Sequence, residues 1–159
     1  AHHYLDYGKT KANPGRAWVM VKAPVLTTEA LLKAMHAGDF YCSTGVTLTD
    51  VRRDNNTLGV KIAGQPGVTY KTRYFVTRKG TPLDSKPAVD KDGKPVTGTY
   101  DPGVGEMVLE TDGLESSYTL KGDELYVRAR VDSSRPQNNP GEPGDMERAW
   151  TQPLIPAKP

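Results

Sequence analysis

Apolar and polar residues alternate along much of the chain beyond residue 46, and this alternation predicts β-strands. In residues 125–131 (LYVRARV) every second side chain is apolar, so one face of the strand is expected in a core and the other in water. Pairs of Asn, Asp and Gly separate the runs and are typical of tight turns. The expected strands cover residues 46–51, 57–63, 68–78, 96–100, 106–111, 116–121 and 124–132. Such a series indicates a mainly β fold with an antiparallel β-sandwich.

The first fifty residues carry a different pattern, a strand followed by a helix. Residues 16–23 are expected to form the strand, because turn residues bound them on both sides. In the helix, Thr27 or Thr28 suits the N-cap, and Gly38 suits the left-handed position after the last turn. Apolar residues at three-and-four spacing are expected to form its buried side: Leu31, Leu32 and Met35. The chain returns to a strand at Phe40, which makes a strand–helix unit of the kind that builds α/β barrels or covered parallel sheets.

The end of the chain lacks a clear period. Pro, Asn and Gly are frequent in residues 133–159, so this tail is expected to be irregular. The single large apolar side chain of its ERAWTQP motif, Trp150, is expected to be buried and to hold the tail in place.

Composition narrows the classes of function. Among 159 residues, 36% are hydrophobic and 25% charged, which is typical of a soluble globular protein. The net charge is +2 with both signs mixed along the chain, so nucleic acid is not an expected partner. No apolar run approaches the roughly 18 residues of a membrane-spanning helix, so no membrane partner is expected. No signal-peptide pattern is present, and a periplasmic or secreted location stays open.

Two stretches of the first fifty residues resemble a known enzyme family. Residues 31–45 (LLKAMHAGDFYCSTG) are similar to the segment AL-x-x-G-x-FY-x-STG near the end of the catalytic domain of PHP-type metallohydrolases, the polymerase and histidinol phosphatase superfamily, especially its CehA/McbA-like branch. Tyr4, Pro14-Gly15 and Arg16-Ala17-Trp18 resemble the pattern that follows the last metal motif of the family. The AWTQP run at 149–153 resembles the family more loosely, and the central strands match only in pattern. The resemblance implies that residues 1–50 are the end of a PHP-like α/β barrel and residues 51–159 a C-terminal β-sandwich.

The same resemblance implies a metal ligand near the N-terminus. Family members carry an Asp-x-His element at a strand end, and Ala1-His2 looks like its remainder, with His2 as the ligand of a divalent transition metal ion (Zn, Mn or Fe). From the residues alone, His2, His3 and Asp6 also fit a tag remnant or a solvated terminus. The other metal motifs of the family have no counterpart in this sequence. A complete multi-metal site would therefore need the missing N-terminal catalytic portion or a companion chain.

Two functions follow as hypotheses. In the first, the chain is the C-terminal part of a metal-dependent hydrolase whose metals activate a water toward a small-molecule phosphate or similar ester. The isolated chain is then expected to be inactive and to associate with a partner or oligomerise, because the apolar sides of Trp18, Leu31 and Leu32 lack a cover. In the second, the β-sandwich is a non-catalytic module that binds carbohydrate or protein. The rings that could serve it are Tyr70, Tyr74, Phe75, Tyr100, Tyr118 and Tyr126, although rings in strands usually face a core.

Three further groups carry weaker signals. Residues 42–44 (CST) with His36 as base suggest a nucleophile, but no nucleophile elbow accompanies them, so a structural turn with a buried thiol is expected. Residues 90–93 (DKDG) resemble a calcium loop without its spacing, so a hairpin turn is expected. The arginines that alternate with apolar strand positions are expected on solvated faces: Arg73, Arg78, Arg128 and Arg130.

Overall fold

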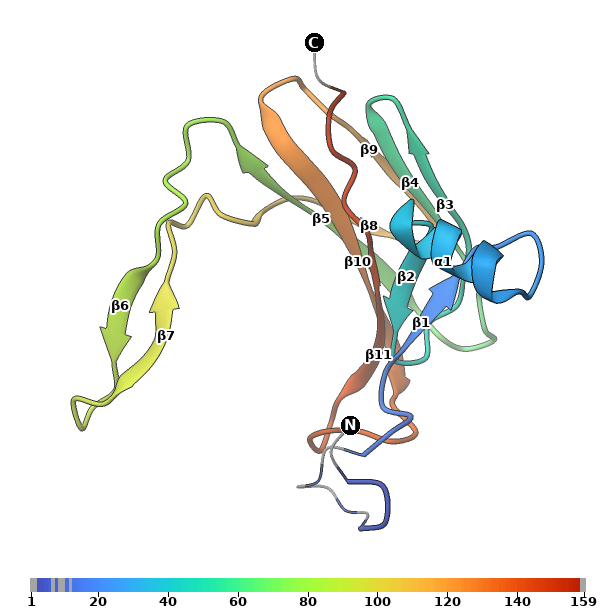
Figure 1. Ribbon diagram of the computed structural model, residues 1–159, viewed down its shortest axis with the longest axis horizontal. Helices are drawn as coiled ribbons and strands as arrows, with labels where there is room; N and C mark the ends of the chain where they lie inside the picture. Colours follow the sequence, from blue (N-terminus) through green and yellow to red (C-terminus); the bar gives the residue numbers. More distant parts are fainter. Residues whose placement is uncertain (1–2, 7, 9–10, 12, 158–159) are drawn as a thin grey trace.

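Two antiparallel sheets with a shared core form the body of the computed structural model, which describes residues 3–6, 8, 11 and 13–157 (Figure 1). The larger sheet has six strands in the order β1-β2-β11-β10-β5-β8, and the smaller has three in the order β3-β4-β9. A third sheet contains only β6 and β7. The prediction of a mainly β fold with an antiparallel sandwich is confirmed.

The strand bounds follow the predicted series with two additions, β6 and β11. The elements in chain order are β1 (Trp18–Val21), α1 (Thr28–His36), β2 (Phe40–Ser43), β3 (Leu48–Asp54), β4 (Thr57–Ile62), β5 (Tyr70–Arg78), β6 (Lys86–Val89), β7 (Pro95–Thr99), β8 (Glu106–Asp112), β9 (Glu115–Thr119), β10 (Glu124–Pro136) and β11 (Met146–Thr151).

The core lies between the two large sheets and follows from the alternation in the sequence. In β10, Val127, Ala129 and Val131 are buried, whereas the residues between them face outward. From the smaller sheet, Leu58 and Val60 of β4 join the same cluster. Tyr74 and Tyr118 stack with ring centroids 5.8 Å apart, which brings β5 and β9 together across the core. The expectation of inward strand tyrosines is met by Tyr70, Tyr74 and Tyr118, each at most 6% exposed. It is wrong for Tyr126, which is half-buried on the outer face of β10.

Glycine and asparagine shape the turns as the sequence predicted. Asn55 has φ +34° in the tight turn between β3 and β4. The DKDG segment is a hairpin turn, in which the Asp90 carboxylate accepts hydrogen bonds from the amides of Asp92 and Lys94 at 2.9 Å. Gly93 follows with φ +77°. The hairpin interpretation of residues 90–93 is confirmed.

The strand–helix unit at the start does not build a parallel pair. β1 and β2 are antiparallel neighbours, with Trp18 opposite Ser43 and Val21 opposite Phe40. β2 then pairs with β11, so the first two strands continue the six-stranded sheet across the boundary predicted near residue 50. The parallel arrangement is therefore wrong for these two strands, because α1 is an excursion within a hairpin-like connection. Membership of residues 1–50 in a PHP-like barrel stays a prediction.

The tail prediction is corrected as well. β10 extends to Pro136, and β11 lies inside the six-stranded sheet between β10 and β2. Glu147, Ala149 and Thr151 are the buried residues of β11, whereas Trp150 is on the outer face and only half-buried. The tail is therefore held by a strand ladder rather than by one buried tryptophan. Gly45 lets the Glu147 side chain of β11 pack against the turn after β2, since a Cβ at position 45 would lie 2.2 Å from Cδ of Glu147.

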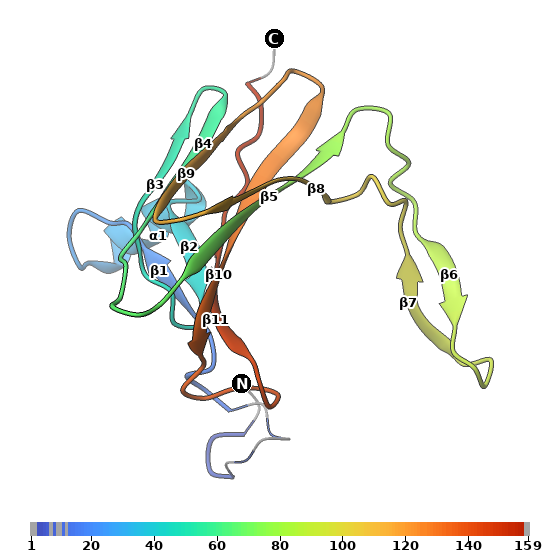
Figure 2. The same ribbon diagram turned by 180° about the vertical axis from the view of Figure 1, so that it is seen from behind.

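The β6–β7 hairpin projects from the body as an arm on the side away from α1 (Figures 1 and 2). At its base, a Cβ added to Gly103 would lie 3.1 Å from Cγ2 of Thr81, so the segment that leads into β6 and the segment that follows β7 run close together there. None of the described residues of β6 or β7 is buried, and Val89 is 63% exposed. A two-stranded hairpin of this kind contributes little to the stability of the body.

Removal of the arm is therefore expected to leave the body folded. Replacing residues 83–101 with a short Gly-Ser linker should change the melting temperature by no more than about 2 °C, because no core contact is lost. Circular dichroism melting of the two proteins measures this. A fall of ten degrees or more, roughly the effect of losing about 3 to 5 kcal/mol, would show that the arm packs on the body.

Candidate functional site

The predicted metal ligand, His2, lies outside the described residues. Its neighbour His3 is half-buried, and the carbonyl of His3 accepts a hydrogen bond from Nδ2 of Asn13 at 3.0 Å. Asp6 forms an ion pair with Lys11 at 2.7 Å. Within residues 3–6, 8, 11 and 13–157, no group of three or more His, Cys, Asp or Glu side chains is placed to hold a metal ion. The metal role of His2 stays a prediction.

The hydroxyls of the Cys-Ser-Thr run serve the backbone. Oγ of Ser43 donates to the carbonyl of Val46 at 2.7 Å and accepts from the amide of Gly45 at 2.9 Å. Oγ1 of Thr44 accepts from the amide of Arg148 at 2.8 Å and so links this turn to β11. His36 is exposed on α1. These contacts support the structural reading of the run, but Cys42 is half-buried on the outer face rather than buried.

Charged residues on the outer face of the six-stranded sheet form a connected network. Asp132 accepts from Arg73 at 2.7 Å and from Arg130 and Arg148 at 2.9 Å each. Glu110 accepts from Lys71 and Arg73, and these two hydrogen bonds hold the pKa of Glu110 below its usual value. The Arg130 guanidinium also lies 5.4 Å from the ring centroid of Phe75. These cations are therefore already occupied by partners of the chain itself.

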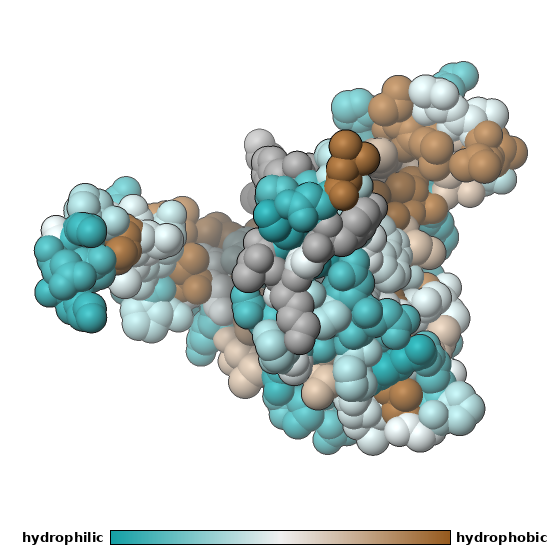
Figure 3. Space-filling model, turned by 90° about the horizontal axis from the view of Figure 1, so that it is seen from below, coloured by the Kyte–Doolittle hydropathy of each residue, from teal (hydrophilic) through white to brown (hydrophobic). Residues whose placement is uncertain are grey.

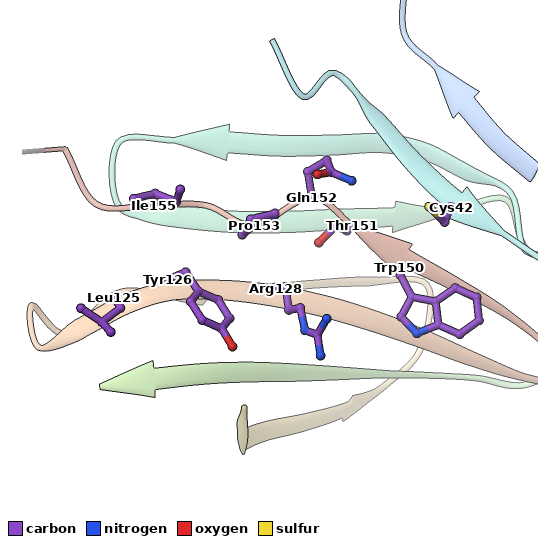
Figure 4. A pocket seen from close by; sticks show the side chains of 9 residues that line it. All are labelled: Cys42, Leu125, Tyr126, Arg128, Trp150, Thr151, Gln152, Pro153 and Ile155. Atoms are coloured by element: carbon purple, nitrogen blue, oxygen red, sulfur yellow. The ribbon is translucent and has the colours of Figure 1, made fainter. Parts of the chain in front are cut away.

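An open groove of about 560 Å³ runs along the same face between β10 and the segment that follows β11 (Figure 4). Arg128 is in its middle, with Tyr126 and Trp150 on either side along the groove, and all three side chains point to the same side of the sheet (Figure 4). Gln152 adds an amide to the lining. The full lining comprises Cys42, Leu125, Tyr126, Arg128, Trp150, Thr151, Gln152, Pro153 and Ile155.

The strand register explains how the groove residues come together. Trp150 is opposite Arg130 on β10 and opposite Cys42 on β2. Tyr126, Arg128 and Arg130 alternate on one face of β10, so they lie beside Trp150 on the outer face. Oγ1 of Thr77 donates to the phenol oxygen of Tyr126 at 3.0 Å, which fixes that ring at the end of the groove.

A second surface is apolar and lies at the opposite edge of the sheet from β8. It comprises β1, the following loop and α1, and we call it the α1–β1 surface. β1 is an edge strand, and side chains on both of its faces are exposed. In Figure 3 brown side chains gather at the end of the molecule that carries α1, away from the arm. The exposed apolar residues of this surface are Trp18, Val19, Met20, Val25, Leu26, Leu32 and Met35.

The helix is attached to the body mainly through its C-terminal end. Its N-cap is Thr27, whose Oγ1 accepts from the amide of Ala30 at 3.3 Å, and Gly38 has φ +73°, both as predicted. Ala34 is the buried residue of α1. Arg53 of β3 donates to the carbonyl of Ala37 at 3.2 Å and to Asp39 at 2.7 Å.

The side of α1 predicted to be buried is largely uncovered. Leu32 is 52% and Met35 43% exposed, and Leu31 is half-buried. The prediction that these three residues form a buried side is therefore wrong for Leu32 and Met35. Of the three residues that the incomplete-barrel hypothesis expects to lack a cover, Trp18 and Leu32 are exposed and Leu31 is half-buried.

Sequence reasoning did not find the groove. Arg128 was expected on a solvated strand face, where it is indeed exposed, but its position between two rings depends on the pairing of distant strands. Tyr126 belonged to the candidate aromatic set, whereas Trp150 was expected to be buried. The signal that was available is the alternation of Arg148 and Trp150 with Ala149 and Thr151, which marks an outward tryptophan once β11 is recognised as a strand.

No protein-family model, curated protein or solved structure matches this chain. In the part of the chain that the structure describes, no helix is long and apolar enough to cross a membrane.

Proposed function

We propose that the chain is an accessory β-sheet module of a metal-dependent hydrolase, and that the α1–β1 surface docks onto the polypeptide that carries most of the metal ligands. The observation that carries the docking is the apolar edge formed by Trp18, Val19 and Met20 beside the uncovered side of α1. An exposed apolar edge strand is a strong association site, because its backbone groups and side chains both lack a cover.

The accessible surface of the chain supports association. It is 10481 Å², whereas a folded monomer of 17.4 kDa is expected to expose about 7,900 Å². The excess is larger than the roughly 800 Å² that each partner buries in a standard specific interface. The partner is expected to offer an apolar face with a charged rim, because exposed charges accompany the apolar side chains of this surface, among them Lys22, Glu29 and Lys33.

The hydrolase assignment follows from the resemblance to PHP-type enzymes. In such a site divalent metal ions activate a water and stabilise the charge that develops on an ester oxygen. His2 is the residue of this chain proposed to reach the metals, and the remaining ligands come from the docked polypeptide, whether fused or separate. The described residues then support the docked polypeptide and position His2, rather than supplying catalytic groups.

A self-sufficient, non-catalytic binding module is the second candidate, and the open groove beside Trp150 favours it. The two candidates differ in what the chain does without a partner. The docking module is expected to associate through α1, whereas the self-sufficient module is expected to be monomeric and to bind its ligand unaided.

Polar replacement of the helix side tests the docking. The double variant Leu32→Gln, Met35→Gln should keep its melting temperature within about 2 °C, because both side chains are exposed and Gln is a good helix former. It should also bind much less of a hydrophobic dye and lose its association with the polypeptide that carries the metal ligands in sedimentation experiments. The matched control is Leu83→Gln at the base of the arm, whose residue is 56% exposed. Equal behaviour of the double variant and the control would contradict a specific docking role.

A further inference from the structure

The groove of Figure 4 contains one positive charge that the chain itself does not neutralise. Arg73, Arg130 and Arg148 all donate to Asp132, as described above. Arg128 is exposed, and among the described residues its guanidinium has no hydrogen-bond or ion-pair partner. An arginine in a concave, largely apolar lining is suited to a carboxylate, which it can bind through two parallel hydrogen bonds.

Two aromatic rings flank this charge at a defined spacing. Arg130, the position opposite Trp150, follows Tyr126 by four positions along β10, so the two aromatic residues lie about 13 Å apart along the strand direction. That separation is too long for one ring-sized ligand to contact both. It suits an elongated ligand with flat apolar faces toward each end and a negative charge between them.

The floor of the groove disfavours a peptide. The amide of Val127 donates to the carbonyl of Leu154 at 3.0 Å, and the amide of Leu154 donates to the carbonyl of Val127 at 2.8 Å. These backbone groups are therefore already paired, and an added peptide strand would find no free edge at this point. The amide of Gln152 and the open shape fit the hydroxyls of a carbohydrate chain better.

We infer that this groove binds an acidic oligosaccharide built from uronic acid units, with a carboxylate on Arg128 and sugar faces on Tyr126 and Trp150. The inference does not depend on the docking function of the α1–β1 surface, because the groove lining includes none of the exposed residues that define that surface. Affinity is expected to fall as salt is added, since the contact between Arg128 and the carboxylate is exposed to solvent.

Tryptophan fluorescence provides a direct test. The chain has two tryptophans, Trp18 and Trp150, so the Trp18→Phe variant leaves Trp150 as the reporter in the groove. Titration of this variant with tetragalacturonate should shift or quench the emission in a saturable way. The neutral tetrasaccharide maltotetraose should bind at least about tenfold more weakly, because it lacks the carboxylates.

Two variants that each remove one positive charge distinguish binding in the groove from general electrostatic attraction to the protein. Arg128→Gln should weaken tetragalacturonate binding at least about tenfold. Arg52→Gln removes the same charge from an exposed position on β3 and should leave binding unchanged. Equal loss in both variants, no saturable response to tetragalacturonate, or preferential binding of an acidic peptide such as tetraglutamate would each overturn the inference.

Discussion

Tyr74→Ala is expected to lower the free energy of unfolding by about 3 to 5 kcal/mol, the largest effect of any single substitution considered for this chain. Tyr74 is fully buried, stacks on Tyr118 and shares a hydrogen bond of 2.8 Å with the hydroxyl of Ser116. Its removal leaves a cavity at the junction of the two large sheets. Urea denaturation followed by tryptophan fluorescence measures the loss.

Two controls define the origin of that loss. Tyr74→Phe keeps the ring and removes only the hydroxyl, so it should cost about 1 kcal/mol. Tyr100→Ala removes a ring that is 57% exposed and should change stability by less than about 0.5 kcal/mol. If Tyr74→Ala were no more destabilising than Tyr100→Ala, the shared core of the two sheets would be wrong.

Glu124→Gln is expected to destabilise the protein by about 2 to 3 kcal/mol at pH 7, because it weakens charge-assisted hydrogen bonds in a fully buried position. The hydroxyl of Tyr118 donates to Oε1 of Glu124 at 2.7 Å. The amides of Lys121 and Gly122 donate to Oε2 at 2.9 and 3.0 Å. The carboxylate thus closes the turn between β9 and β10 and joins the two sheets.

The Glu124 carboxylate is also expected to make the stability of the protein depend on pH. Burial alone would raise the pKa of Glu124, but the hydrogen bonds from Tyr118 and the turn amides outweigh burial and hold the pKa below its usual value of 4.5. A lowered pKa gives stability that is present above pH 4.5 and is lost as the pH falls through the pKa of the folded protein. Burial and the Glu124 carboxylate raise the pKa of Tyr118 to about 12, so the phenol stays a donor throughout this window.

The wild type and Glu124→Gln should therefore become more similar in stability as the pH is lowered. Thermal melting of both proteins from pH 7 to pH 3 measures the difference. Glu115→Gln is the control, because Glu115 forms an ion pair with Lys61 at the surface. A difference between wild type and Glu124→Gln that stays constant down to pH 3 would contradict the role of the charged carboxylate.

Alternation predicted best the strands whose buried face is mostly apolar. β5 and β10 are the clearest cases, because Tyr70, Tyr74 and Val76 alternate with outward residues in one and Val127, Ala129 and Val131 in the other. The sequence pattern did not predict β11, because its inner face carries Glu147, Ala149 and Thr151, of which only one is apolar. Arg135 pairs with Glu147 at 3.5 Å, a contact between residues that no local pattern connects.

β6 and both surfaces illustrate other limits of local sequence reasoning. β6 has no buried face, so it lacks the alternation by which strands are recognised. The groove brings Arg128 of β10 beside Trp150 of β11, and that register is set by long-range pairing. The helix pattern at Leu32 and Met35 correctly marked an apolar side, but the chain does not supply its cover.

Native mass spectrometry of the protein purified from its native source tests the proposed function most directly. We expect a complex heavier than 17.4 kDa that contains a second polypeptide, or this sequence fused to one, together with two or three divalent transition-metal ions and activity toward a phosphate ester. Where the second polypeptide is separate, the Leu32→Gln, Met35→Gln variant should not bind it. A lone, metal-free species of 17.4 kDa would contradict the docking function and leave the chain as a self-sufficient binding module.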